Sequence, residues 1–174
     1  MYGSIKHHAE AGDARAGVEL GAMYQKGIGV QQDYAEALAW DGKSANQGNA
    51  LGEKNLGDLY FDVLGVSRDC TKAFAWYQKA ADQGDAAGEE GVGRFYLYGI
   101  GMVSDFGQAR GLFLKAEAQG NGDADYYLGP AYEFGCSRQK DMAEAIAWYQ
   151  KGAALGSAIA EDDLGKKYRS GIGV

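Results

Sequence analysis

Hydrophobic, glycine and tyrosine positions recur along this chain at a constant interval of 36 residues. Three columns of the pattern run through the sequence without a gap: Leu20, Leu56, Val92, Leu128 and Leu164; Gly21, Gly57, Gly93, Gly129 and Gly165; Tyr24, Tyr60, Tyr96, Tyr132 and Tyr168. Self-similarity at such a period is typical of proteins built from one short unit stacked several times. The pattern predicts a single repeat domain over residues 1–174, in which each unit buries its apolar face against its neighbours.

Each unit contains the pattern of two helices joined by a turn. In the first unit, hydrophobic residues at helical spacing predict a helix over residues 14–26, with Asp13 as its N-cap and Gly27 at its C-terminal end. Asp33 is then expected to cap a second helix, and Glu36, three residues later, to complete an acidic capping box. Repeated helix pairs of this kind predict an all-α fold.

Small and large residues follow one another along the second helix of every unit. An alanine column and, three positions later, a large and mostly tryptophan column are conserved within the chain: Ala37, Ala73, Ala109 and Ala145; Trp40, Trp76, Leu112 and Trp148. Such a pattern lets antiparallel helices approach closely and interdigitate. Glycine in a helix interior costs about 1 kcal/mol relative to alanine, so the glycine column of the first helices is predicted to lie where two backbones cross.

The period divides the chain into four full units with a partial unit at each end. The predicted boundaries are 12–47, 48–83, 84–119 and 120–155, with 1–11 as the end of a preceding second helix and 156–174 as a half unit. Either the chain is a fragment of a longer array or its C-terminal face is covered by something else. An uncovered apolar end would favour self-association.

Some positions depart from the repeat. Pro130 falls inside the first helix of the fourth unit and predicts a kink or an early break, because proline removes a helical hydrogen bond. Val63 replaces the glycine that ends the first helix in the first unit, and Ser137 and Arg138 replace a Gly-Val pair, so both turns are expected to differ. These irregularities indicate a natural array and not an idealised one.

Several repeated residues together resemble a known family. They are Leu56, Gly57, Tyr60, Gly65, Val66, Asp69, Ala73, Trp76, Tyr77, Lys79, Ala80, Ala81 and Gly84. The pattern resembles the SEL-one-like repeat, a unit related to the tetratricopeptide repeat, over essentially the whole chain. The resemblance implies a right-handed α-α superhelix, or solenoid, of antiparallel helix pairs whose first helices line a concave face. It also implies a role as an adaptor in protein quality control, bacterial signalling or host contact.

Composition narrows the classes of partner. The formal net charge is −7, and 46% of the residues are hydrophobic. Because nucleic acids and anionic membranes attract basic surfaces, we expect no nucleic-acid partner. No apolar run reaches the roughly 20 residues that cross a bilayer, and the first residues lack the apolar stretch of a signal peptide, so no membrane insertion is expected.

The two cysteines, Cys70 and Cys136, lie nearly two units apart in the sequence. Stacked helical layers are roughly 8–10 Å apart, which places the pair beyond the Cα separation of a disulfide. Two unpaired thiols favour a reducing compartment such as the cytoplasm. Cys70 follows the expected N-cap Asp69, where a thiol is activated, so a thiol-redox role is a distant alternative to an inert thiol.

Residues typical of catalysis or metal binding are sparse. His7 and His8 are the only histidines and are expected at a solvated helix end. The acidic clusters at 89–90 and 161–163 are sequential on helices, where neighbouring side chains point apart. The turn at 98–101 is similar to a phosphate-binding loop, yet it follows a helix and lacks the third glycine. The sequence thus predicts no enzyme, no metal site and no cofactor.

A second face of the first helices is a better candidate for function. If the leucine and tyrosine columns face neighbouring helices, another stripe of aromatic and charged residues shares the opposite surface. We expect these residues to bind a partner on the concave face: Arg15, Lys26, Lys54, Asp58, Phe61, Asp62, Arg94, Leu97, Tyr98, Tyr126, Phe134 and Lys166. Aromatic anchors among charges are typical of a peptide-binding surface. The alternative is that Phe61, Tyr98 and Phe134 only seal the helix pairs.

The leading hypothesis is therefore a non-catalytic scaffold or adaptor. Its partner would be a peptide or protein surface of apolar and basic character, which suits a chain with a net charge of −7. The alternative is a structural segment of a longer array that self-associates through its ends, including the open C-terminal end. An enzyme is the most distant alternative, because it would require an enclosed cleft with converging titratable groups.

Overall fold

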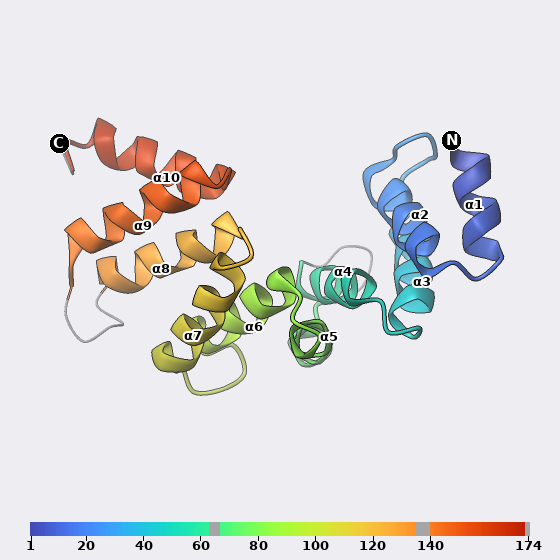
Figure 1. Ribbon diagram of the computed structural model, residues 1–174, viewed down its shortest axis with the longest axis horizontal. Coiled ribbons are helices and arrows are strands. Elements are labelled where there is room, and N and C mark those ends of the chain that lie inside the picture. The colour runs from blue at the N-terminus through green and yellow to red at the C-terminus, as the bar shows by residue number, and fades with distance from the viewer. Residues whose placement is uncertain (63–66, 135–139, 173–174) are drawn as a thin grey trace. The chain divides into compact units, whose positions relative to one another are not determined.

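A computed structural model describes residues 1–62, 67–134 and 140–172 of the chain. These residues form ten α-helices and no β-strand (Figure 1). The helices are α1 (Tyr2–Glu10), α2 (Ala14–Lys26), α3 (Tyr34–Ala45), α4 (Ala50–Phe61), α5 (Cys70–Asp82), α6 (Ala86–Tyr98), α7 (Phe106–Glu117), α8 (Gly122–Phe134), α9 (Met142–Ala154) and α10 (Ala158–Arg169). The all-α prediction is confirmed. In this described part, no helix is long and apolar enough to cross a membrane.

The chain divides into two compact units, Met1–Gly91 and Val92–Val174. In the first unit, helices consecutive in the sequence pack against each other from α1 to α5, and α2 also contacts α4. In the second unit, α7 packs on α8, α8 on α9 and α9 on α10, and α8 also contacts α10. The pairs α2 and α4, and α8 and α10, are first helices of successive repeats. In each pair the two helices contact each other, although a second helix separates them in the sequence.

Helix ends follow the predicted caps. Asp13 precedes α2, and its side chain accepts hydrogen bonds from the backbone N–H groups of Arg15 at 2.8 Å and Ala16 at 3.2 Å. Gly27 ends α2 in the left-handed conformation, with a φ of 68° that favours glycine. The four second helices α3, α5, α7 and α9 all begin after an aspartate whose side chain caps the first turn: Asp33, Asp69, Asp105 and Asp141.

The predicted capping box at α3 is wrong. The backbone N–H of Asp33 donates to the carbonyl oxygen of Tyr24 at 2.9 Å and so needs no side-chain partner. The Glu36 carboxylate instead accepts a hydrogen bond from the indole Nε1 of Trp40 at 3.1 Å. Glu144 binds Trp148 in the same way, also at 3.1 Å, so this i,i+4 pair replaces the capping box in both helices.

The recurrent glycines allow aromatic rings to pack against the first helices. A Cβ atom on Gly57 would lie only 2.5 Å from the ring of Tyr77, and one on Gly93 would lie 2.6 Å from the ring of Phe113. Real Cβ atoms do not come this close to other atoms, so only glycine fits. The predicted crossing of two backbones at these glycines is wrong, because the group that approaches is the side chain of the residue that follows the tryptophan column.

The residues of this aromatic column are fully buried, whereas Trp76 and Trp148 are only partly buried and Trp40 is 7% exposed. Tyr77, Phe113 and Tyr149 are exposed by 2% or less. Trp76 packs only partly buried against the cluster around Leu56, and its outer side carries the Lys79 ammonium, 3.9 Å from the ring centroid. The alanine column at the same helix crossing is completely buried in all four repeats: Ala37, Ala73, Ala109 and Ala145.

Pro130 does not break its helix. The helix α8 continues through Pro130 to Phe134, so the predicted early break is wrong. Leu128 and Ala131 on either side are exposed by 1% or less, and their packing holds the backbone helical despite the lost hydrogen bond. The turns predicted to be irregular at Val63 and at Ser137 lie outside the described residues.

Of the two cysteines, the structure describes one. Cys70 is a free, partly buried thiol at the first position of α5, directly after its cap Asp69. Cys136 lies outside the described residues, so the predicted absence of a disulfide stays a prediction.

Candidate functional site

A hollow of about 260 Å³ lies between α8 and α10 in the second unit, and we call it the C-terminal hollow. It is lined by Tyr98, Tyr126, Pro130, Glu133, Phe134, Tyr149, Asp163, Lys166 and Lys167. The structure thus brings together four residues that the sequence assigned to the binding face: Tyr98, Tyr126, Phe134 and Lys166.

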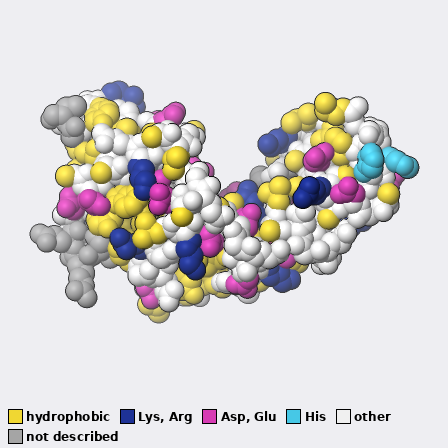
Figure 2. Space-filling model, in the orientation of Figure 1, with side chains coloured by type: hydrophobic (Ala, Val, Ile, Leu, Met, Phe, Trp, Pro, Cys, Tyr) yellow, Lys and Arg dark blue, Asp and Glu magenta, His cyan; other side chains and the backbone are white. Residues whose placement is uncertain are grey.

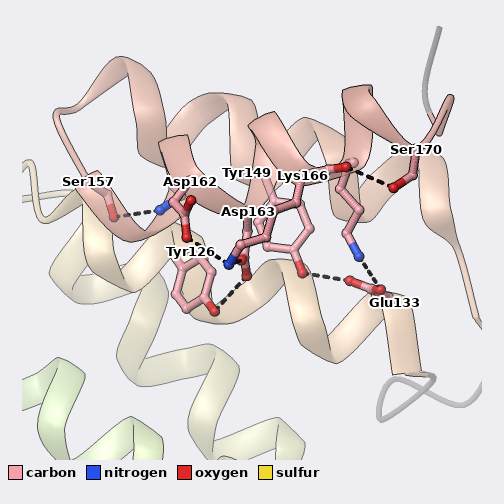
Figure 3. Close-up of polar contacts among 10 residues, drawn as sticks. Tyr126, Glu133, Tyr149, Ser157, Asp162, Asp163, Lys166 and Ser170 are labelled. Carbon is pink, nitrogen blue, oxygen red and sulfur yellow. Dashed lines mark hydrogen bonds and ion pairs between the residues drawn. The ribbon is translucent and has the colours of Figure 1, made fainter.

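Charged and phenolic groups in this hollow bind one another. The Tyr126 hydroxyl on α8 donates to Oδ2 of Asp163 on α10 at 3.0 Å, and Lys166 Nζ donates to Oδ1 of the same carboxylate at 2.9 Å (Figure 3). The Tyr149 hydroxyl donates to Oε2 of Glu133 at 2.8 Å, and Lys167 forms an ion pair with the other oxygen. These contacts hold the lining side chains in fixed positions before any partner binds.

The pKa values of these groups keep the network intact at neutral pH. Burial, followed by the hydrogen bond to a carboxylate, raises the pKa of both Tyr126 and Tyr149 above that of free tyrosine. Burial opposes ionisation of Asp163, but the hydrogen bonds from Lys166 and Tyr126 outweigh it and lower the pKa of this carboxyl. The tyrosines therefore remain hydroxyl donors and Asp163 remains an acceptor.

Two aromatic side chains at the mouth of the hollow are largely exposed. Tyr98 is 54% exposed and Phe134 is 67% exposed, although large aromatics tend to be buried. In the view of Figure 2, hydrophobic side chains gather over α8 and α9, with basic and acidic side chains beside them. Exposed rings bordered by polar groups are the usual composition of a protein-binding patch.

A second hollow, of about 520 Å³, lies in the first unit between α2 and α4, and we call it the N-terminal hollow. It is lined by Val18, Ala22, Gln25, Lys26, Tyr34, Leu51, Lys54, Asn55 and Asp58. Three predicted residues, Lys26, Lys54 and Asp58, meet here. Lys54 Nζ lies 2.6 Å from Asp58 Oδ2, and although burial works to lower the pKa of Lys54, the Asp58 carboxylate raises it overall.

The two hollows occupy the same place in the first and fourth repeats. Six pairs of lining residues are 108 positions apart, which is three repeats: Val18 and Tyr126, Ala22 and Pro130, Gln25 and Glu133, Lys26 and Phe134, Asn55 and Asp163, Asp58 and Lys166. The repeat architecture therefore forms a hollow between successive first helices, and substitutions at equivalent positions change its size and chemistry.

The remaining predicted residues lie elsewhere within their own units. Arg15 lines a separate hollow together with His8 and Glu19. Phe61 is partly buried, with the Arg68 guanidinium carbon 4.7 Å from its ring centroid. Asp62 is exposed at the C-terminal end of α4.

Two predicted residues of α6 differ in exposure. The Arg94 guanidinium carbon lies 5.4 Å from the ring centroid of Tyr127 and is partly buried. Leu97 is only 6% exposed, so it belongs to the core, and the prediction that it binds a partner is wrong. The stripe of residues is wider than the exposed face of the helix, because the neighbouring helices cover its edge.

Asp41 is the feature that the sequence analysis missed. It occupies the place of Tyr77, Phe113 and Tyr149 in the aromatic column, and it is completely buried. The amide of Asn55 donates to its Oδ1 at 3.1 Å, whereas Oδ2 accepts no hydrogen bond from any described residue. Burial raises the pKa of the Asp41 carboxyl to about 7. The signal in the sequence was a carboxylate in a column that is otherwise aromatic.

A second buried carboxylate, Asp125, also interrupts a repeated interaction. In the second repeat, Glu53 accepts a hydrogen bond from the amide of Gln83, thirty residues later, at 2.7 Å. The same spacing from Asp125 leads to Leu155, which has no donor. Neither oxygen of Asp125 accepts a hydrogen bond within the described part of the chain, and Lys151 Nζ is 3.8 Å away. Burial raises the pKa of this carboxyl to about 6.

The described residues contain no group of three or more histidine, cysteine, aspartate and glutamate side chains that could hold a metal ion. His7 and His8 are both exposed on α1, where the His8 ring nitrogen contacts the carbonyl oxygen of Ser4 at 2.8 Å. Both hollows are instead lined by paired charges and apolar surface, which suits recognition of another molecule.

The order of the helices and the spacing of the caps match a known repeat. The Sel1 repeat family matches four consecutive segments of the chain, at residues 14–49, 50–85, 86–121 and 122–157. This chain belongs to the Sel1 repeat family. No curated protein matches the sequence.

Solved structures of Sel1 repeat proteins have the same fold. A Sel1 repeat protein from Oxalobacter formigenes is 35% identical over 96% of this chain and 68% of its own, with a TM-score of 0.79. A protective antigen of uropathogenic Escherichia coli with this fold, c5321, is 32% identical over 97% of this chain, with a TM-score of 0.80. The matched region is only 36% of the antigen's length. A Klebsiella pneumoniae Sel1 repeat protein, at 24% identity and a TM-score of 0.77, shares the fold over 98% of this chain and 82% of its own.

These similarities confirm the predicted repeat family and the solenoid of antiparallel helix pairs. Sel1 repeat solenoids are generally protein-interaction scaffolds and are typically non-catalytic.

Proposed function

We propose that this Sel1 repeat chain is a non-catalytic scaffold that binds a peptide or protein segment on the surface formed by its first helices. The observation that carries the proposal is the C-terminal hollow, where exposed Tyr98 and Phe134 stand beside two internally satisfied charge networks. Such a surface offers apolar anchors without leaving buried charges unpaired.

Charge favours a basic or neutral partner. The chain has a formal net charge of −7, so basic segments approach it faster and acidic ones are repelled. Within the C-terminal hollow itself, Glu133 and Asp163 are balanced by Lys166 and Lys167. Local recognition would therefore depend on the aromatic anchors, while the long-range field selects the overall charge of the partner.

A peptide selection tests the proposal. Random dodecapeptides displayed on phage are selected on the immobilised protein, and a selected peptide is titrated calorimetrically against the wild type and a Tyr98→Ala/Phe134→Ala variant. Each exposed ring is expected to contribute about 1–2 kcal/mol to binding, so the double variant should bind at least tenfold more weakly. Both rings are more than half exposed, so folding should be unaffected.

Val103→Ala is the matched control, because Val103 is an 88% exposed hydrophobic residue that does not line the hollow. Equal peptide affinity of the control and the wild type would show that losing an exposed apolar side chain elsewhere does not weaken binding. Unchanged affinity of the double variant would refute binding at the C-terminal hollow.

A further inference from the structure

We propose that the N-terminal hollow takes the aromatic ring of a tyrosine side chain supplied by the partner, beside the place where later repeats hold a ring of their own. This inference rests on the proposed binding function and names the chemistry that one hollow would recognise. It follows from the comparison of equivalent positions in the first, second and fourth repeats.

In the second and fourth repeats, a tyrosine of the second helix extends from the core towards the first helices. Tyr77 packs on Gly57 and Gly91, and its hydroxyl donates to Asp58 Oδ1 at 2.8 Å. Tyr149 packs on Gly129, and its hydroxyl donates to Glu133 at 2.8 Å. Tyr149 is itself part of the lining of the C-terminal hollow, so the ring takes up space there.

The first repeat lacks this ring. Asp41 stands at the equivalent position and ends at its hydrogen bond with Asn55, which is the counterpart of Gly91. Ala22 is the counterpart of Asp58 and offers no carboxylate. Both Ala22 and Asn55 line the N-terminal hollow, whose volume of about 520 Å³ is twice that of the equivalent hollow in the fourth repeat.

The walls of the N-terminal hollow suit a ring that enters from the solvent. Its apolar surface comes from Val18, Ala22, Tyr34 and Leu51. Leu51 is 50% exposed in the protein without a partner. Asn55 supplies a polar group beside the buried Asp41, whose Oδ2 accepts no hydrogen bond from the described residues. An aromatic ring with a polar tip matches apolar walls that end in a polar group.

The charges at the mouth favour a neutral ring over a basic side chain. Lys26, Lys54 and Asp58 line the hollow, and the carboxylates of Glu90 and Asp85 also act on Lys54. Asp58 is already paired with Lys54 at 2.6 Å. The one carboxylate of the lining is thus already neutralised, so a lysine or arginine of the partner would gain no free carboxylate there, whereas a phenol carries no charge at neutral pH.

The test is a titration of the ¹⁵N-labelled protein with N-acetyl-tyrosinamide, followed by NMR, with N-acetyl-leucinamide as the ring-free control. We expect saturable shifts of the Ala22, Leu51 and Asn55 amide signals at millimolar tyrosinamide and at least threefold weaker shifts with the leucine compound. Absence of these shifts, or equal shifts with both compounds, would overturn the inference.

Two variants make the test specific. Asp41→Tyr/Asn55→Gly restores the pair that Tyr77 and Gly91 form in the second repeat, so the protein's own ring should narrow the hollow towards the size of the C-terminal hollow, and the tyrosinamide shifts should be lost. Leu51→Ala removes an exposed wall without touching the core, and binding should weaken at least threefold. If the double variant does not fold, Leu51→Ala decides; undiminished binding to either folded variant contradicts the proposal.

The outcome is separable from that of the proposed function. If a selected peptide binds through Tyr98 and Phe134 but tyrosinamide does not bind the N-terminal hollow, this inference alone fails. If tyrosinamide binds but no selected peptide depends on Tyr98 and Phe134, the proposed use of the C-terminal hollow fails and the present inference stands.

Discussion

Gly57 packs directly beneath the buried ring of Tyr77, and replacing it by alanine tests how the repeats are held together. The new Cβ would lie 2.5, 2.6 and 2.9 Å from three atoms of the ring. The ring cannot move away easily, since Tyr77 is 2% exposed, also packs on Gly91 and is fixed by its hydrogen bond to Asp58.

The change in the free energy of unfolding caused by Gly57→Ala is the sum of two opposing effects. Alanine stabilises a helix interior by about 1 kcal/mol relative to glycine, whereas overpacking a core costs about 1–3 kcal/mol and sometimes more. Because backbone and ring are both constrained at Gly57, we expect a steric cost at the upper end of this range, about 3 kcal/mol, and the free energy of unfolding to fall by about 2 kcal/mol after the helical gain.

The control is Gly111→Ala in α7, where the new Cβ would meet nothing within 4 Å and only the helical gain of about 1 kcal/mol applies. The assay is urea denaturation followed by circular dichroism at 222 nm, with the two variants predicted to shift the midpoint in opposite directions. A Gly57→Ala protein as stable as Gly111→Ala would refute the packing argument. Tyr77→Ala in the Gly57→Ala background should relieve the clash and so give a non-additive double-mutant cycle.

The remaining predictions concern the two buried carboxylates. Asp41 has a pKa of about 7 in the folded protein and about 4 when unfolded, so the folded state retains a proton that the unfolded state releases, and stability should fall as the pH rises from about 4 to 7. Asp41→Asn should flatten this part of the dependence of melting temperature on pH; an unchanged slope would show that Asp41, beside Lys54 and Asp58, does not titrate there. Leu155→Gln should give Asp125 the donor that Gln83 gives Glu53, and we expect it to raise the free energy of unfolding at pH 7 by about 1 kcal/mol and to lower the pKa of Asp125 from about 6. Equal stability of this variant and the wild type in urea would contradict the assigned geometry.

Much of the fold was predictable because local rules and the repeat agree. Asp13 and Gly27 end α2 where their capping chemistry requires. The glycine column indicated a close approach, but at Gly57, Gly93 and Gly129 the approaching group is a side-chain ring and not a second backbone. The role of Glu36 was mispredicted because its carboxylate has two donors within reach. It accepts its hydrogen bond from the Trp40 indole and not from the backbone N–H of Asp33. Pro130 was misassigned because tertiary packing outweighs a local cost.

The candidate site was predictable in its members but not in its grouping. Helical spacing placed Tyr98, Tyr126, Phe134 and Lys166 on a common surface, and they line one hollow. Spacing could not show that Leu97 is buried or that Lys26 and Lys54 belong to a different hollow. Those facts depend on how helices pack, as does the burial of Asp41 on α3, whose neighbours come from α2 and α4.

The most direct test of the central claim is a crystal structure of the protein with a peptide selected on it. The account predicts that the peptide contacts the first helices and places an apolar side chain in the C-terminal hollow against Tyr98 and Phe134. A peptide seated on the outer surface of the second helices, beside Trp76 or Trp148, with the hollow unchanged would contradict it.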